Sequence, residues 1–176
     1  VGMAPIDTDH DGLSTLRAAA DGKLELLILL GADPINDCPD ADLARRALAG
    51  ARRIVAIDTH PSESANLADV VLPAAAYGEK SGTTTNLEGR VSTLSTKVTP
   101  QGTARPDWMI AAELALMLGY ERGLADVTTV AEITAAIAAE VPGFAGVTPA
   151  ALAADPDGVL ADVIPASSSD HPHRAL

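Results

Sequence analysis

The stretch LELLILL at residues 24–30 decides the fold. It is nearly continuous in aliphatic side chains and ends at Gly31, which is typical of a strand buried on both faces of a sheet. A second apolar run at residues 54–57 ends in Asp58, and a helix with Asp40 as its N-cap is predicted between the two runs. A strand, a helix and a strand in this order form a βαβ unit, in which the two strands are parallel.

The segments on either side extend this pattern. Residues 69–72 predict a third short strand, which Pro73 stops. Further helices are predicted over residues 13–20 and 106–118, from Thr129 onward, and around residues 149–153. The helix at 106–118 carries few charges, so we expect it to be buried on most sides.

Together these elements predict an α/β fold: a Rossmann-like three-layer domain with a mainly parallel sheet. Residues 77–99 depart from the pattern because they are polar, rich in Gly and Thr and without a helical period. We expect a long extended segment or hairpin there. The predicted domain covers residues 13–165, after an irregular N-terminal segment at 1–12 and before a disordered, Ser-rich tail at 166–176.

The composition excludes several classes of function. The formal net charge is −12, so no nucleic-acid partner is expected. The single cysteine, Cys38, excludes an internal disulfide and an all-cysteine iron–sulfur site. The apolar run at residues 26–30 is too short to cross a bilayer, and the first residues lack the features of a signal peptide. We therefore expect a cytoplasmic protein without direct membrane insertion, and the start at Val1 leads us to expect further residues upstream.

Two local motifs resemble ligand-binding motifs, but each lacks residues that the binding motif requires. Residues 7–12 (DTDHDG) imitate the start of a calcium loop, yet Ala18 stands where that loop needs a bidentate Glu. The turn GADP at residues 31–34 is not the GxGxxG of a dinucleotide-binding fold. Asp58 remains a candidate acceptor for a ribose or a base, although a strand-end cap of local amides is the favoured interpretation. No metal site and no catalytic residue are predicted.

The Gly- and Thr-rich stretch has the chemistry of a ligand groove. Gly82 lets a backbone approach closely, Thr83 and Asn86 offer donors and acceptors, and Arg90 can pair with a phosphate or carboxylate. These groups together suit a large polar heterocycle. The alternative is a hairpin whose polar side chains satisfy one another.

Five short sequence motifs, which we call boxes, resemble the molybdopterin oxidoreductase superfamily and occur in the family's order. The part of the family that they resemble is its second nucleotide-binding-type α/β domain. The boxes are GADP at residues 31–34, Asp58 with Glu63, ADVVLP at 68–73, EKSGTTTNLEGR at 79–90 and GTARPDW at 102–108. Asp33 departs from the family, which usually has Asn before the proline. Within the family, the details resemble the large iron–sulfur subunit of the proton-pumping NADH-quinone oxidoreductases, through RVSTL at 90–94, PDWMIAAELA at 106–115 and PGFAG at 142–146.

The resemblance to that subunit implies a parent protein with iron–sulfur clusters, which passes electrons from NADH toward quinone in the cytoplasmic peripheral arm of complex I. It implies that this domain has no cofactor of its own and docks other domains of the same subunit and other peripheral-arm subunits. In relatives that carry the cofactor, the bis-guanine dinucleotide lies near the positions that match Asp58, Gly82, Thr83, Asn86 and Arg90. We expect these five residues to line a vestigial molybdopterin-dinucleotide groove.

Two alternatives stay open. The chain would instead be a fragment of a molybdoenzyme such as a formate dehydrogenase, in which the same groove binds the molybdopterin guanine dinucleotide. In that enzyme a cysteine or selenocysteine on a missing segment would lie beside the cofactor. The second alternative, a free-standing nucleotide-binding protein, is disfavoured because the chain lacks a phosphate loop and a Met start.

Overall fold

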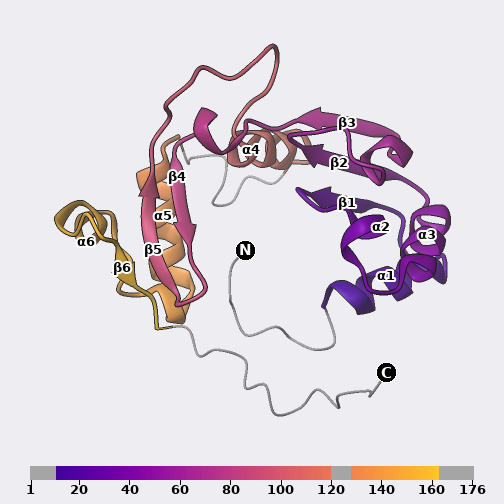
Figure 1. Ribbon diagram of the computed structural model, residues 1–176, viewed down its shortest axis with the longest axis horizontal. Helices are drawn as coiled ribbons and strands as arrows, with labels where there is room; N and C mark the ends of the chain where they lie inside the picture. The colour runs from indigo at the N-terminus through magenta and orange to yellow at the C-terminus, as the bar shows by residue number, and fades with distance from the viewer. Residues whose placement is uncertain (1–10, 120–127, 163–176) are drawn as a thin grey trace. The chain divides into compact units, whose positions relative to one another are not determined.

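The computed structural model describes residues 11–119 and 128–162, which form two compact units (Figure 1). Among these residues, the larger unit holds 11–82, 94–119 and 128, and the smaller unit holds 83–93 and 129–162. The fold is mixed α/β, as predicted. Both the predicted tail and nearly all of the predicted irregular N-terminal segment lie outside the described residues.

The larger unit is built on a three-stranded parallel sheet. Its strands are β1 (Leu27–Leu30), β2 (Ile54–Asp58) and β3 (Val70–Pro73), in the order β1-β2-β3. Leu27 lies opposite Ile54, and Val55 lies opposite Val70. The predicted βαβ unit and the predicted third strand are therefore confirmed.

Two of the helices of the larger unit, α1 (Gly12–Ala20) and α3 (Ala41–Gly50), begin at aspartates whose side chains cap them. The larger unit also holds α2 (Pro34–Asp37) and α4 (Asp107–Met117), with short 3-10 turns η2 (Ala65–Leu67) and η3 (Tyr77–Glu79). The Asp11 carboxylate accepts from the Ser14 N–H (2.6 Å), and the Asp40 carboxylate accepts from the Leu43 N–H (2.9 Å). Each bond satisfies one of the N–H groups that the first turn of a helix leaves without a partner.

Two apolar clusters hold this sheet, one on each face. On one face, α1 and α3 pack on the strands, and the cluster includes Leu16, Leu29, Ala47 and Ala56. The two helices approach so closely at Gly50 that a Cβ there would overlap the carbonyl oxygen of Ala19. On the other face, α4 packs over β2 and β3, and the buried residues there are Ile57, Ala74 and Ile110.

Two expectations about burial are wrong. In β1, Leu27 and Leu29 are buried, but Ile28 and Leu30 are 50% and 61% exposed. The reason is that β1 is an outer strand and that α4 packs over its neighbours instead. Helix α4 was expected to be buried on most sides, yet only Ile110 is buried and its last turn is exposed.

The smaller unit combines a second sheet with helices. Strands β4 (Gly82–Thr85), β5 (Arg90–Leu94) and β6 (Val159–Leu160) follow in that order, and β5 and β6 are antiparallel. The first residue of β4, Gly82, and the last residue of β5, Leu94, belong to the larger unit. The helices are α5 (Val130–Glu140), η4 (Pro142–Phe144) and α6 (Pro149–Ala154). Its core is apolar and consists of Val91, Phe144, Val147, Leu152 and Ala161. Within the described parts of both units, no helix is long and apolar enough to cross a membrane.

Candidate functional site

A small polar pocket lies in the larger unit where β1 and β2 end. Its volume is about 170 Å³, and its lining includes the carboxyl ends of both strands, with Gly31, Asp58, Lys80 and Asp107. Ligands of open α/β sheets bind outside the carboxyl ends of the strands, because loops and helix starts present polar groups there. We define the carboxyl-edge pocket by these residues together with Leu30, Ile57, Thr59 and Ala74.

Asp58 is the predicted site residue in this pocket, and its own chain already occupies it. Its Oδ1 accepts from the N–H groups of Thr59 (2.7 Å) and His60 (3.3 Å), and its Oδ2 accepts from the Ser62 hydroxyl (3.2 Å). Three donors from the four residues after the strand therefore hold the carboxylate. This geometry agrees with the strand-end cap that was the favoured interpretation of Asp58.

Lys80 and Asp107 form an ion pair on the wall of the pocket. The Lys80 ammonium lies 2.5 Å from Asp107 Oδ2, and the two side chains are 23% and 36% exposed. Asp107 begins α4, where the positive end of the helix dipole also favours its negative charge. Its other oxygen, Oδ1, is buried and has no hydrogen-bond partner among the described residues. Such an oxygen can accept one more hydrogen bond from a bound donor.

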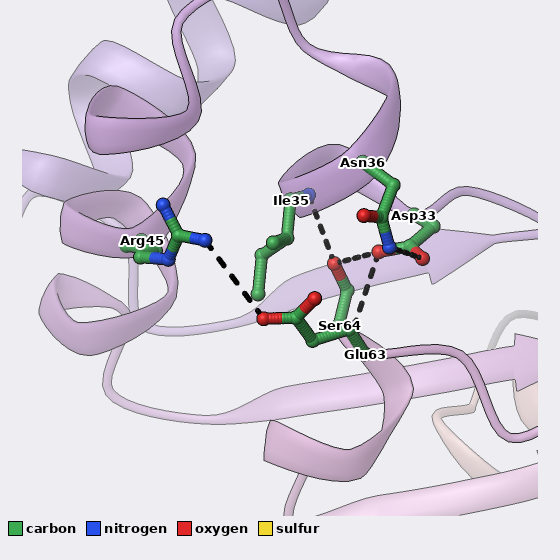
Figure 2. A network of polar contacts seen from close by, with 6 residues as sticks. All are labelled: Asp33, Ile35, Asn36, Arg45, Glu63 and Ser64. Atoms are coloured by element: carbon green, nitrogen blue, oxygen red, sulfur yellow. Dashed lines mark hydrogen bonds and ion pairs between the residues drawn. The ribbon is translucent and has the colours of Figure 1, made fainter.

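A second polar network, shown in Figure 2, joins the turn after β1 to the turn after β2. The hydroxyl and the N–H of Ser64 both donate to Asp33 Oδ1 (2.5 and 3.2 Å), and the Asn36 amide donates to Asp33 Oδ2 (2.6 Å). The Ser64 hydroxyl also accepts from the Ile35 N–H (3.1 Å). The network fixes the two turns next to each other beside the carboxyl edge of the sheet.

The network explains why a carboxylate stands at position 33. Hydrogen bonds from the Ser64 hydroxyl and then from the Asn36 side chain hold the pKa of Asp33 below its usual range. A carboxylate accepts at both oxygens, whereas an Asn at this position would direct an N–H₂ group at one of the two donors. Glu63, which belongs to the matched box, instead forms an exposed ion pair with Arg45 at 3.9 Å.

The other predicted site residues lie on the strands β4 and β5 and in the turn between them. Asn86 Oδ1 accepts from the N–H groups of Glu88 and Arg90, both at 2.9 Å, so that Asn86 closes the turn. The Arg90 guanidinium donates to the carbonyl of Gly158 (2.9 Å). Thr83 is exposed, and open space surrounds the position that a Cβ on Gly82 would take.

The five predicted groove residues are divided between the units. Asp58 and Gly82 belong to the larger unit, whereas Thr83, Asn86 and Arg90 belong to the smaller one. The groove that they were expected to share therefore stays a prediction. Within the described parts of the chain, no group of three His, Cys, Asp or Glu side chains is placed to hold a metal ion.

The residues of the carboxyl-edge pocket do not fit a whole guanine dinucleotide. Pockets for ligands of drug size usually measure about 300–1,000 Å³, and this one measures about 170 Å³. The pocket has room for a group the size of a base or a ribose. Asp107, one of the lining residues, carries a buried oxygen, Oδ1, that has no hydrogen-bond partner among the described residues.

Sequence reasoning missed three residues that matter at this edge. Ser64 is fully buried and links the two turns, while Lys80 and Asp107 pair across 27 positions of sequence. Lys80 and Asp107 each stand in one of the boxes that carry the family resemblance, which is the one signal that points to them.

Comparison with known proteins gives one family match. The model of the molybdopterin oxidoreductase family matches residues 3–116. Among solved structures, the acetylene hydratase from Pelobacter acetylenicus is similar with a TM-score of 0.57 and 24% identity, over 68% of this chain and 17% of that one. At this identity the likeness concerns the fold alone.

Three curated relatives illustrate the range of the similar proteins. The alpha subunit of the NADPH-Fe(3+) oxidoreductase of Geobacter sulfurreducens is 34% identical over 81% of this chain. The G 2 subunit of the NADH-quinone oxidoreductase of Rhizobium meliloti is 36% identical over 86% of it. The alpha subunit of the F420-dependent formate dehydrogenase of Methanocaldococcus jannaschii is 43% identical over 55% of it. The matched regions cover 17%, 17% and 14% of these relatives.

Proposed function

Because the chain belongs to the molybdopterin oxidoreductase family, we propose that it is a segment of the large iron–sulfur subunit of an NADH-quinone oxidoreductase. In that subunit, iron–sulfur clusters outside this segment would pass electrons from NADH toward quinone. The segment would act as a scaffold that docks other domains of the subunit and other subunits of the peripheral arm of complex I. It would have no redox centre of its own, and it would lie in the cytoplasm, peripheral to the membrane.

One observation carries the scaffold role. Three of the four polar residues at the positions that match the cofactor groove, Asp58, Asn86 and Arg90, already bind their own chain. Asp58 caps the turn after β2, Asn86 closes the turn between β4 and β5, and Arg90 holds the carbonyl of Gly158. A side chain that serves as a local cap or tie has fewer free lone pairs or N–H groups for a ligand. The small volume of the carboxyl-edge pocket supports the same role.

The same proposal includes the finer features of the fold. We assign residues 13–165 to a Rossmann-like, three-layer domain of the molybdopterin oxidoreductase type, with residues 77–99 as its long Gly- and Thr-rich extended segment. The parallel sheet with α1 and α3 on one face and α4 on the other supports this assignment. The segments 1–12 and 166–176 would lie outside the domain.

A second candidate function has an observation in its favour. The chain would be part of the domain that binds the bis-molybdopterin guanine dinucleotide in a molybdoenzyme such as a formate dehydrogenase. Asp107 Oδ1, buried and without a partner in the described part of the chain, supports it because a bound base would supply the missing donor. The 43% identity to a formate dehydrogenase subunit supports it as well.

Metal analysis of the full-length subunit separates the two functions. The purified subunit is analysed for molybdenum and tungsten by mass spectrometry, and a denatured, oxidised extract is examined for pterin fluorescence. The scaffold function predicts iron but neither molybdenum, tungsten nor a fluorescent pterin. Stoichiometric molybdenum or tungsten together with the pterin would establish the second function instead.

A further inference from the structure

Helix α4 is apolar around its whole circumference. Its charged residues are Asp107 and Glu113, and all its other residues are Ala, Ile, Leu, Met or Trp. Both charges are already paired within the larger unit, the first with Lys80 and the second with Arg105. A helix of this composition normally lies inside a large protein, where neighbours cover it on most sides.

The structure covers one side of this helix. Ile110 and Leu114, four residues apart, pack against the parallel sheet. Met117 follows Leu114 after three residues, so it lies on the same side of the helix. It is nevertheless 82% exposed, and its neighbours Leu116 and Leu118 are 62% and 73% exposed. The apolar stripe that packs on the sheet therefore continues beyond it without cover from the described residues.

We call Leu116, Met117 and Leu118 the α4 patch. Exposed apolar patches mark interfaces, and the most apolar interfaces are the permanent ones. The patch has no charged residue of its own, and the charges of α4 have partners already, so its occupant needs no charge either. These properties indicate an apolar, uncharged surface that stays in place permanently.

The length of the relatives indicates where this surface comes from. The chain accounts for 17% of two relatives that match over most of it, so most of the polypeptide of such a protein lies outside the segment. That polypeptide is tethered to the patch, which raises its effective concentration there. A second copy of the chain is less suitable, because each copy has a net charge of −12 and two copies repel each other.

We propose that a part of the full-length subunit outside residues 1–176 covers the α4 patch with an apolar, uncharged surface. The cover forms within the subunit, before the subunit meets the other subunits of the complex. This proposal gives the docking between domains of the same subunit, proposed above, a defined place, and it rests on that role.

The oxidation of Met117 by hydrogen peroxide measures the cover. Peroxide transfers one oxygen atom to the thioether sulfur, which gives methionine sulfoxide and water, and exposed side chains react faster. Peptide mass spectrometry follows the reaction at Met117 in the 176-residue chain and in the isolated full-length subunit. We expect the rate in the subunit to be at least about tenfold lower, because the cover must open first. Equal rates in the two proteins would overturn the proposal.

The variant Lys23→Met supplies the matched control. It places a methionine of similar length at a charged surface position, whose side chain is 69% exposed. We expect this methionine to be oxidised at a similar rate in the chain and in the subunit. Equal protection of both methionines in the subunit would overturn a cover that is specific to the α4 patch.

The same reaction distinguishes the possible occupants. Protection of Met117 that appears only after the complex is assembled would overturn the proposal, because another subunit would then be the cover. A rate in the 176-residue chain that falls as the chain concentration rises would overturn it too, since a second copy would then cover the patch. A rate in the chain that is as low as in the subunit would show that the chain covers Met117 itself, which also contradicts the proposal.

The substitution Met117→Gln gives a second readout. We expect it to leave the thermal midpoint of the 176-residue chain unchanged, because the side chain is exposed there. In the full-length subunit we expect a lower midpoint, because the cover then buries an amide without a partner. An unchanged midpoint in the subunit would overturn the proposal. These measurements involve neither molybdenum nor a pterin, so their failure is distinct from a failure of the scaffold function.

Discussion

At the scale of single residues, Asp33 illustrates how a position that matches a cofactor-binding family takes on a structural task. Its two oxygens accept from Ser64 and Asn36, and Ser64 in turn accepts from Ile35. The residue thereby joins the turns that follow two neighbouring strands. Since Ser64 is fully buried, its hydroxyl depends on protein partners rather than on water.

Replacement of Asp33 tests this task. We expect Asp33→Ala to lower the free energy of unfolding by about 1–3 kcal/mol, because the buried hydroxyl of Ser64 loses its acceptor. Asp33→Asn keeps one acceptor and should cost about 1 kcal/mol. Urea denaturation measures both values. The control is Glu25→Gln, which removes an exposed ion pair with Arg52 and should change the stability by less than about 1 kcal/mol. A stability of Asp33→Ala equal to that of the control would contradict the assigned task.

The pH dependence of the stability that Asp33 contributes gives a second prediction at the residue scale. The pKa of Asp33 is lowered in the folded state from its usual value of 3.8, so the ionised carboxylate stabilises the fold. This contribution is present above the unfolded pKa and is lost as the pH falls through the folded pKa. The stability difference between the natural chain and Asp33→Asn should therefore be constant at neutral pH and shrink below about pH 4. A difference that does not change down to about pH 2 would contradict a lowered pKa.

At the scale of elements, the antiparallel pairing of β5 and β6 depends on Gly158, the residue directly before β6. Gly158 has a φ of +90° and approaches the strand β5 so closely that a Cβ would lie 2.5 Å from the carbonyl oxygen of Val91. Its own carbonyl accepts from the guanidinium of Arg90. A side chain at this position would strain the backbone and push β6 away from β5.

We therefore expect Gly158→Ala to destabilise the smaller unit by about 1–3 kcal/mol. Hydrogen exchange at Val91 and Ala161, whose N–H groups lie in or beside β5 and β6, would report the loss locally. Gly146→Ala is the matched control in the same unit, because it has no neighbour within 4 Å of the new Cβ. Faster exchange in the control than in Gly158→Ala would be incompatible with the close approach described for Gly158.

The elements also show what the sequence could predict. The strands β1 and β2 and the helix α3 between them follow from local signals, namely apolar runs and the capping residue Asp40. The exposure of β1 does not follow from such signals, because an apolar run contains no information on which strand becomes the outer one. The pair of Lys80 and Asp107 was missed because its partners come from distant segments and form no periodic pattern. The groove residues illustrate a third case, since a turn that binds itself and a turn that binds a ligand use the same residue types.

At the scale of the whole molecule, the chain spans about one sixth of its relatives' length and divides into two compact units. Of the residues that match the dinucleotide positions, Asp58 in the larger unit and Asn86 and Arg90 in the smaller one are engaged by hydrogen bonds within their own unit. We therefore predict a structural module in which these residues hold the fold together.

Titration calorimetry of the 176-residue chain with GDP and GTP tests this central claim most directly. Because Asp58, Asn86 and Arg90 already bind their own chain, we predict no measurable heat of binding at micromolar concentrations of either nucleotide. A dissociation constant in the micromolar range, lost in the variant Asp58→Ala, would contradict the claim and establish a working nucleotide site.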